Sequence, residues 1–232
     1  MKHFGAGLSE LHKELNTIIR KQDKVEYAKR LFLDLHAALH LSAISGRAKN
    51  EVDQLLCDLS PHEYRIMPTA KDETIAWVLW HIARIEDLTM GILVADREQL
   101  FNDEWRKQLN TPISDTGNAL TDDEIMEFSK QINIDKLIAY RNAVGQRTCD
   151  IVKTLTATDM KRRVTSLGLA TIRQIGGVTD QKDSLWLLDF WSKKDVAGIL
   201  LMPPTRHVML HLNDCCKWKQ QIRERKKYFH ST

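Results

Sequence analysis

Cysteine, proline and glycine are scarce in this chain of 232 residues, which has 4 cysteines, 5 prolines and 10 glycines. The cysteines are unevenly spaced, which excludes a disulfide framework and indicates a reducing compartment. So few prolines and glycines exclude collagen-like and proline-rich classes. No apolar run approaches the roughly 20 residues of a membrane span, and the N-terminal segment lacks the apolar core of a secretory signal. We therefore expect a cytoplasmic protein with no membrane partner.

A charge excess of one sign is also absent. The 34 basic and 31 acidic residues leave a net charge of +3, which is too small to indicate a nucleic-acid partner. Basic residues gather near the C-terminus, where they match the dipole of a final helix. Hydrophobic residues make up 43% and charged residues 28% of the chain, which is typical of a globular protein with a core of its own.

What the sequence has in abundance is helical periodicity, because apolar residues recur three or four apart and no segment alternates as a strand does. The residues Thr121-Asp122-Asp123-Glu124 form a capping box and predict a helix start. Asp72 is expected to cap another helix. The pattern predicts helices over 25–45, 48–59, 70–95, 135–155, 184–191, 196–201 and 203–227.

Four long amphipathic helices predict an all-α four-helix bundle. Its connections are long, above all 156–203, which excludes a minimal bundle with tight loops. No composition shift marks a boundary, so we expect one domain over 1–232. The bundle core would span 25–227, with 1–24 as an N-terminal extension.

Histidines are the best candidates for chemistry. His81 lies in the middle of an apolar helical stripe, and His207 and His211 are four residues apart on the last helix. That spacing places two imidazoles on one helix face, where a metal can bind both, and His81 could supply a third nitrogen. Cys215 lies four residues beyond His211, so His81, His211 and Cys215 form a second candidate ligand set.

These histidines also have a purely structural interpretation. The chain contains another pair at the same spacing, His36 and His40, and a histidine on an apolar stripe is more often a hydrogen-bonded core residue than a ligand. Imidazole ligands suit Zn, Ni, Fe and Cu alike, so the metal is not fixed by the residues. Glu86 and Asp87 follow His81 and could orient an imidazole or act as a base, although solvated helix charges are the commoner arrangement.

The long segment 156–203 carries the aromatic residues Trp186, Phe190 and Trp191 just before the last helix. Long connections in compact domains are usually functional or disordered, and apolar rings argue against disorder. We expect this segment to cover one end of the bundle and to wall a pocket that contains His81. The alternative is that the rings only extend the core.

Two stretches resemble a known family. The run from Asp72 to Asp87, which reads DETIAWVLWHIARIED, resembles the second-helix motif of the DinB-like family, and RHVMLHLN from Arg206 to Asn213 resembles its histidine-bearing fourth helix. The resemblance implies a four-helix bundle with long crossovers. It also implies a divalent metal held by one histidine of the second helix and two of the fourth. Here these are His81 with His207 and His211, or, in another register, His211 with Cys215 in place of the second histidine.

Characterised DinB-like relatives are thiol-dependent S-transferases and a thiol-dependent isomerase, which use low-molecular-weight thiols in bacteria. The resemblance therefore implies a metal-dependent transferase, with Zn or Ni as the divalent ion, that joins such a thiol to a small electrophilic substrate. The competing hypothesis is a metal-free bundle that binds a small molecule or a protein without catalysis. Bundles of this type often pair through exposed helix faces, so a homodimer is one of the assemblies that the sequence allows.

Overall fold

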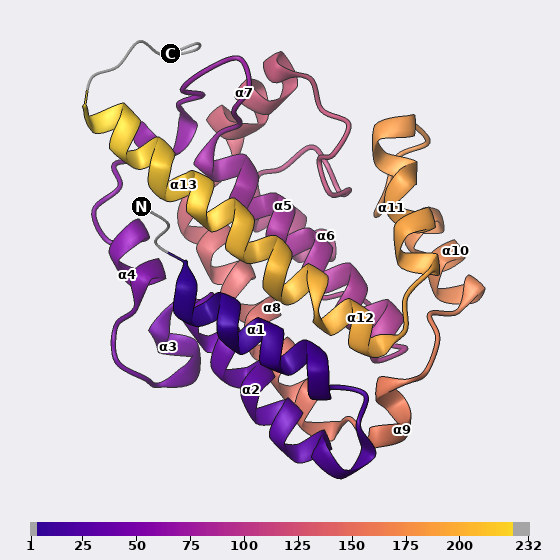
Figure 1. Cartoon of the computed structure of the whole chain (residues 1–232). Helices are drawn as coiled ribbons and strands as arrows, with labels where there is room; N and C mark the ends of the chain where they lie inside the picture. Colours follow the sequence, from indigo (N-terminus) through magenta and orange to yellow (C-terminus); the bar gives the residue numbers. More distant parts are fainter. Residues whose placement is uncertain (1–3, 225–232) are drawn as a thin grey trace.

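Four long helices form the body of the protein in the computed structural model, which describes residues 4–224 (Figure 1). They are α2 (Val25–Ala38), α5 (Ile75–Leu88), α8 (Ile134–Thr154) and α13 (Val208–Arg223). Helix α5 occupies the centre and packs against both α8 and α13, while α2 packs against α8. The described residues hold no strand and only one isolated β-bridge, so the predicted all-α fold is confirmed.

Helix α5 is buried on every side, with all 14 of its residues buried, including four polar or charged ones. It begins after Thr74, whose hydroxyl accepts a hydrogen bond from the Trp77 N–H and so satisfies one of the unpaired donors of the first turn. The prediction that Asp72 caps this helix is wrong. The Asp72 carboxylate instead accepts a hydrogen bond of 2.8 Å from Trp218 Nε1 on α13.

Several predicted helices are shorter in the structure. The helix expected over 25–45 ends at Ala38, because the chain turns before the short α3 (Ser42–Ser45). The helix expected over 48–59 is α4 (Glu51–Leu56), which begins with a capping box. The capping box predicted at Thr121 is present and starts α7 (Asp122–Gln131).

Two of the long helices are continuous with π-helical segments. Helix α5 runs on into η3 (Thr89–Val94), and η4 (Met202–His207) leads directly into α13. Pro203 and Pro204 stand at the start of η4, where a missing N–H is harmless. Such π segments are rare and are found frequently at functional sites.

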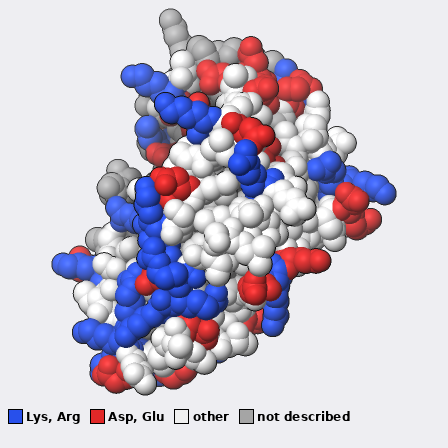
Figure 2. All heavy atoms as spheres, turned by 90° about the vertical axis from the view of Figure 1, so that its right-hand side faces the viewer, with Lys and Arg blue, Asp and Glu red and all other residues white. Residues whose placement is uncertain are grey.

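The crossover before α13 is mostly helical, and its helices α10 and α11 stand beside the bundle (Figure 1). Figure 2 faces this side and shows a broad central area without charged side chains, next to a band of Lys and Arg. The crossover carries three exposed large apolar residues, namely Leu167, Ile175 and Trp186. The crossover helices are α9 (Ala157–Met160), α10 (Ser166–Gln174), α11 (Lys182–Ser192) and α12 (Val196–Leu200).

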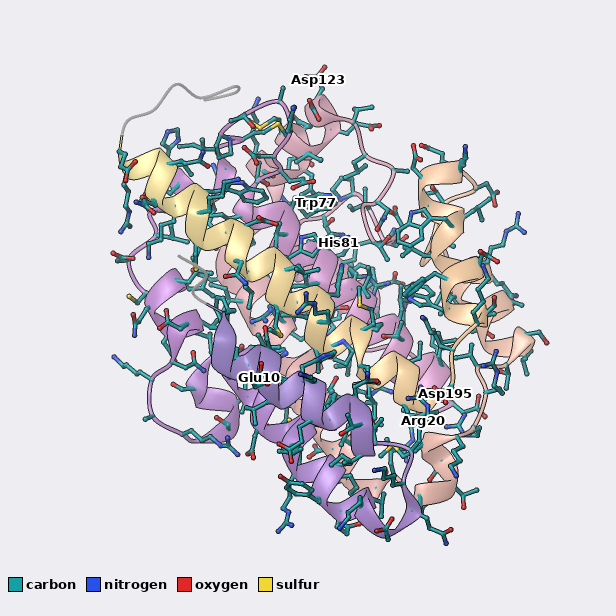
Figure 3. All side chains as sticks on the ribbon, in the orientation of Figure 1. Glu10, Arg20, Trp77, His81, Asp123 and Asp195 are labelled. Carbon is teal, nitrogen blue, oxygen red and sulfur yellow. The ribbon has the colours of Figure 1, made fainter. Side chains whose placement is uncertain are left out.

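The N-terminal segment forms a helix that the sequence patterns did not predict. Helix α1 (Ala6–Ile18) lies along α2, with Leu15 and Ile19 buried. Arg20, which follows it, forms two hydrogen bonds of 2.7 Å with the carboxylate of Asp195 (Figure 3). The remaining short helices are η1 (Gln22–Lys24), η2 (Glu63–Arg65) and α6 (Asp103–Leu109).

The last helix ends at Arg223 in the described part of the chain. Residues 225–227 of the predicted helix and core lie outside the described residues. None of the helices within 4–224 combines the length and the apolar character that crossing a bilayer requires.

Candidate metal centre

Three histidines from two parts of the chain meet in the middle of the bundle. His81 comes from α5, His207 ends η4, and His211 lies in the first turns of α13. The ring centroid of His81 lies 5.0 Å from that of His207 and 5.0 Å from that of His211. The ring centroids of His207 and His211 are 4.6 Å apart. The structure thus brings His81 and His211 together across the bundle, with the edge of one ring toward the face of the other. Figure 3 shows His81 and Trp77 on α5, behind the ribbon of α13.

The three imidazoles direct one nitrogen each toward a common point. His207 Nε2 lies 3.1 Å from the Nε2 atoms of both His81 and His211. The rings cross at 61° to 81°, so the lone pairs converge rather than run parallel. Nitrogens bound to one metal at about 2.0–2.1 Å in tetrahedral geometry would lie about 3.3 Å apart. This spacing therefore fits a shared cation.

A hydrogen bond fixes which nitrogen of His81 faces the cluster. His81 Nδ1 lies 2.8 Å from the carbonyl oxygen of Thr116, which can only accept, so Nδ1 carries the proton and Nε2 keeps its lone pair. Metal-bound histidines commonly hold their other ring N–H in this way. The Trp77 ring stacks on His81 at 4.6 Å between centroids and limits rotation of the imidazole.

The loop that carries Thr116 is held along α5 by successive side chains of that helix. Trp77 Nε1 donates a hydrogen bond to the Gly117 carbonyl oxygen. One helical turn farther on, Trp80 Nε1 donates to the Asp115 carbonyl oxygen. The Arg84 guanidinium donates to the Ser114 carbonyl oxygen. Because one buried helix anchors the whole loop, the carbonyl that orients His81 has little freedom to move.

Burial keeps all three imidazoles neutral. It lowers the pKa of His81 to about 3, with a further contribution from His211, and lowers the pKa of His211 to about 4. Burial and the two neighbouring rings hold the pKa of His207 well below its usual range. Neutral imidazole is the form that binds metals, so the cluster is in its ligand form at neutral pH.

A small cavity opens beside the cluster, with a volume of about 110 Å³. His81 and His207 line one side, and Trp186, Phe190 and Trp191 of α11 line the other. The three rings therefore line a pocket with His81, as expected, but Trp191 is only 1% exposed and also belongs to the core, as the alternative held. Drug-sized ligands occupy about 300–1,000 Å³, so this cavity has room only for the reacting end of a small molecule.

Cys215 lies outside this cluster. It is fully buried farther along α13, and burial raises the pKa of its thiol well above the usual range. Among residues 4–224, the group of potential ligands around His81 contains His207 and His211 but not Cys215. The geometry thus favours the first of the two ligand sets that the sequence left open.

A second buried group joins His36, His40 and Glu86. Glu86 Oε1 accepts a hydrogen bond of 2.8 Å from His36 Nε2, and Oε2 lies 3.3 Å from His40 Nε2. The two rings stack at 4.1 Å with 29° between their planes, so each Nε2 faces its own carboxylate oxygen. This arrangement suits an ion pair better than a shared metal, because the lone pairs do not converge.

Sequence reasoning missed this second group as a unit. The expectation that Glu86 and Asp87 are solvated helix charges is wrong, because both side chains are buried. Asp87 binds Arg84 and Tyr140, also buried, through its carboxylate. In the sequence, the four-residue spacing of His36 and His40 indicates that the two rings share a helix face. It does not indicate that Glu86 is the carboxylate between them.

Comparison with known families agrees with this architecture. The model of the DinB superfamily matches residues 46–213, which is more than half of the chain. The chain belongs to the DinB superfamily. The match spans His81, His207 and His211, which confirms the family resemblance seen in the sequence. None of the curated proteins matches this DinB-superfamily chain.

Proposed function

We propose that this protein is a metal-dependent transferase that joins a low-molecular-weight thiol to a small electrophile. The observation that carries the proposal is the convergence of three neutral imidazole nitrogens, with His207 Nε2 3.1 Å from each of the other two. Three protein ligands leave an open position for a small molecule. A divalent transition metal held by His81, His207 and His211 would lower the pKa of a thiol brought to this position, which would make the thiol a nucleophile at neutral pH.

The residues around the cluster supply orientation and exclusion of water. Thr116 and Trp77 hold the ring of His81, as described above. The aromatic wall of α11 gives the cavity an apolar lining beside His81 and His207. We infer that the carbon under attack lies against this wall, because apolar contacts there would bind an uncharged electrophile. The thiol would then lie on the side of the cavity that the imidazoles line.

In the proposed reaction the thiol loses its proton to solvent, and its sulfur forms a bond to an electrophilic carbon. The bond from that carbon to its leaving group breaks, and the leaving group departs with the electron pair. With an epoxide as electrophile, the oxygen stays attached and takes up a proton from solvent. No oxidant or reductant is required.

Elemental analysis of the purified protein is the first test. We expect about one equivalent of a divalent transition metal, Zn or Ni being the first candidates. The loaded protein is then given glutathione or cysteine with propylene oxide, and loss of free thiol is followed. Metal binding without thiol consumption in any pair would contradict the transferase assignment for these substrates.

The alternative function makes a different prediction in the same experiment. A bundle that only binds small molecules would be isolated without metal and would keep its thermal unfolding midpoint in a chelator. We expect the chelator to lower that midpoint, because a ligand that binds only the folded state stabilises it.

A further inference from the structure

A chain of three hydrogen-bonded side chains crosses the bundle away from the three-histidine cluster. Cys149 on α8 places its Sγ 3.5 Å from His36 Nδ1 on α2. The other nitrogen of that ring, Nε2, lies 2.8 Å from Glu86 Oε1 on α5. A thiol, an imidazole and a carboxylate thus follow one another across three helices, in the order that activated cysteines use.

The ionisation of the imidazole decides the direction of these hydrogen bonds. Burial alone would lower the pKa of His36, but the Glu86 charge and the hydrogen bonds outweigh it and raise this pKa to about 9. At neutral pH both ring nitrogens therefore carry protons. Nε2 donates to the Glu86 carboxylate, and Nδ1 donates to Cys149 Sγ, so the sulfur is the acceptor. Cys149 Sγ therefore lies at the end of an oriented imidazole–carboxylate pair.

The carboxylate is held ionised and in place from a second side. The His36 and His40 interactions keep the pKa of Glu86 well below its usual range despite the cost of burial. Burial, the charge on His36 and Arg141 lower the pKa of His40 to about 3, so that ring stays neutral. His36 therefore stays charged between Glu86 and Cys149 Sγ, while His40 stays neutral.

Cys149 differs from the other cysteines in both partner and access. It is partly exposed, whereas Cys215 and Cys216 are buried. Cys57 is exposed, and its sulfur donates a hydrogen bond to the Gln54 carbonyl oxygen, which is no imidazole. Cys149 alone among the four cysteines, all of them within the described residues, combines an imidazole partner with access to solvent.

We propose that Cys149, whose sulfur accepts a hydrogen bond from the His36–Glu86 pair, is a modification site that undergoes exchange with the disulfide of a low-molecular-weight thiol. Cys149 Sγ attacks one sulfur of the disulfide and forms a new S–S bond, while the S–S bond of the reagent breaks. The departing sulfur leaves as a thiolate and takes up a proton from solvent. Cys149 is oxidised to the mixed disulfide and half of the reagent is reduced to free thiol. This step uses no residue of the three-histidine cluster.

The wild-type protein provides the first test, with Cys57 as an internal control. Limiting iodoacetamide and, separately, glutathione disulfide are applied, and the adduct on each cysteine is followed over time by peptide mass spectrometry. We expect Cys149 to react about tenfold faster than Cys57, although it is less exposed. A Cys57 rate equal to or above that of Cys149 would overturn the proposal.

Substitutions then test the relay. His36→Gln keeps a polar side chain but removes the charge, and should slow adduct formation on Cys149 about tenfold while the Cys57 rate stays unchanged. Cys149→Ser should remove the fast adduct altogether. If His36→Gln does not fold, Glu86→Gln replaces it, because it removes the charge that keeps His36 protonated. In either case the Cys149 and Cys57 rates of the wild-type protein still test the proposal. A folded His36→Gln protein with an unchanged Cys149 rate would show that the imidazole does not activate the thiol.

Discussion

His207 Nε2 lies 3.1 Å from His211 Nε2, although the two residues belong to different kinds of helix. His207 is the last residue of the π segment η4, and His211 is in the α-helix that follows. In the sequence His207 falls at the edge of the apolar stripe of the last helix. In the structure it directs its ring inward, between His81 and His211.

Substitution can distinguish the proposed metal ligands from neighbouring residues of α13. His207→Ala removes the central nitrogen of the cluster, so we expect the bound metal to fall from about one equivalent to nearly none. Cys215→Ala should leave the metal content unchanged, because Cys215 lies outside the cluster. Elemental analysis of the folded variants measures both.

His62→Ala is the matched control, since His62 is an exposed histidine far from the cluster in sequence. It should retain the full metal content. Loss of metal in Cys215→Ala with retention in His207→Ala would reverse the assignment and favour the second ligand set.

The two tryptophans of the pocket wall should behave differently. Trp191 is 1% exposed and Trp186 is 50% exposed. Trp191→Ala leaves a large cavity and should cost about 3–5 kcal/mol of unfolding free energy. Trp186→Ala should cost less than about 1 kcal/mol, yet raise the KM for the electrophile. Urea unfolding and steady-state kinetics measure these effects, and an unchanged KM in Trp186→Ala would show that this ring does not contact substrate.

Gly145 on α8 is required by the ring of His40. A Cβ at this position would lie 2.5 Å from His40 Nδ1, and that buried ring has no room to withdraw. Gly145→Ala should therefore destabilise the protein by about 1–3 kcal/mol. Gly7→Ala is the control, because nothing lies within 4 Å of a Cβ there, and unfolding in urea should show it to be neutral or slightly stabilising.

Stability of the metal-free protein should pass through a maximum between acid and alkaline pH. The folded-state pKa values of His81 and His211 are about 3 and about 4. Below pH ~6.5 the unfolded chain binds protons that these folded imidazoles do not, so stability falls as the pH drops. The pKa of His36 is shifted the other way, to about 9. Its contribution to folding stability is therefore complete below pH ~6.5 and is lost as the pH rises through 9.

Urea unfolding midpoints from about pH 5 to about pH 10 measure the decline in stability on both the acid and the alkaline side. His36→Gln should lose much of the alkaline decline, and His211→Ala should show a smaller acid decline than wild type. Parallel curves for wild type and His36→Gln above pH ~8 would contradict the role assigned to His36.

The helices and the all-α fold could be predicted from the sequence because helical periodicity is a local property. The stripe through His81, the Thr121 capping box and the proline-marked start of the last segment all reappear in the structure. Spacing also placed His207 and His211 on one face of a helix, which is the feature that two ligands of one metal need.

Tertiary contacts decided the rest, because they depend on which residues distant in sequence become neighbours. Both Asp72 and Thr74 can cap a helix, and only the packing of α13 gives Asp72 another partner in Trp218. Glu86 has the pattern of a surface charge until α2 brings two histidines to it. The choice between His207 and Cys215 likewise depended on how the π segment and α13 lie against α5, and the sequence by itself contains no local signal for that geometry.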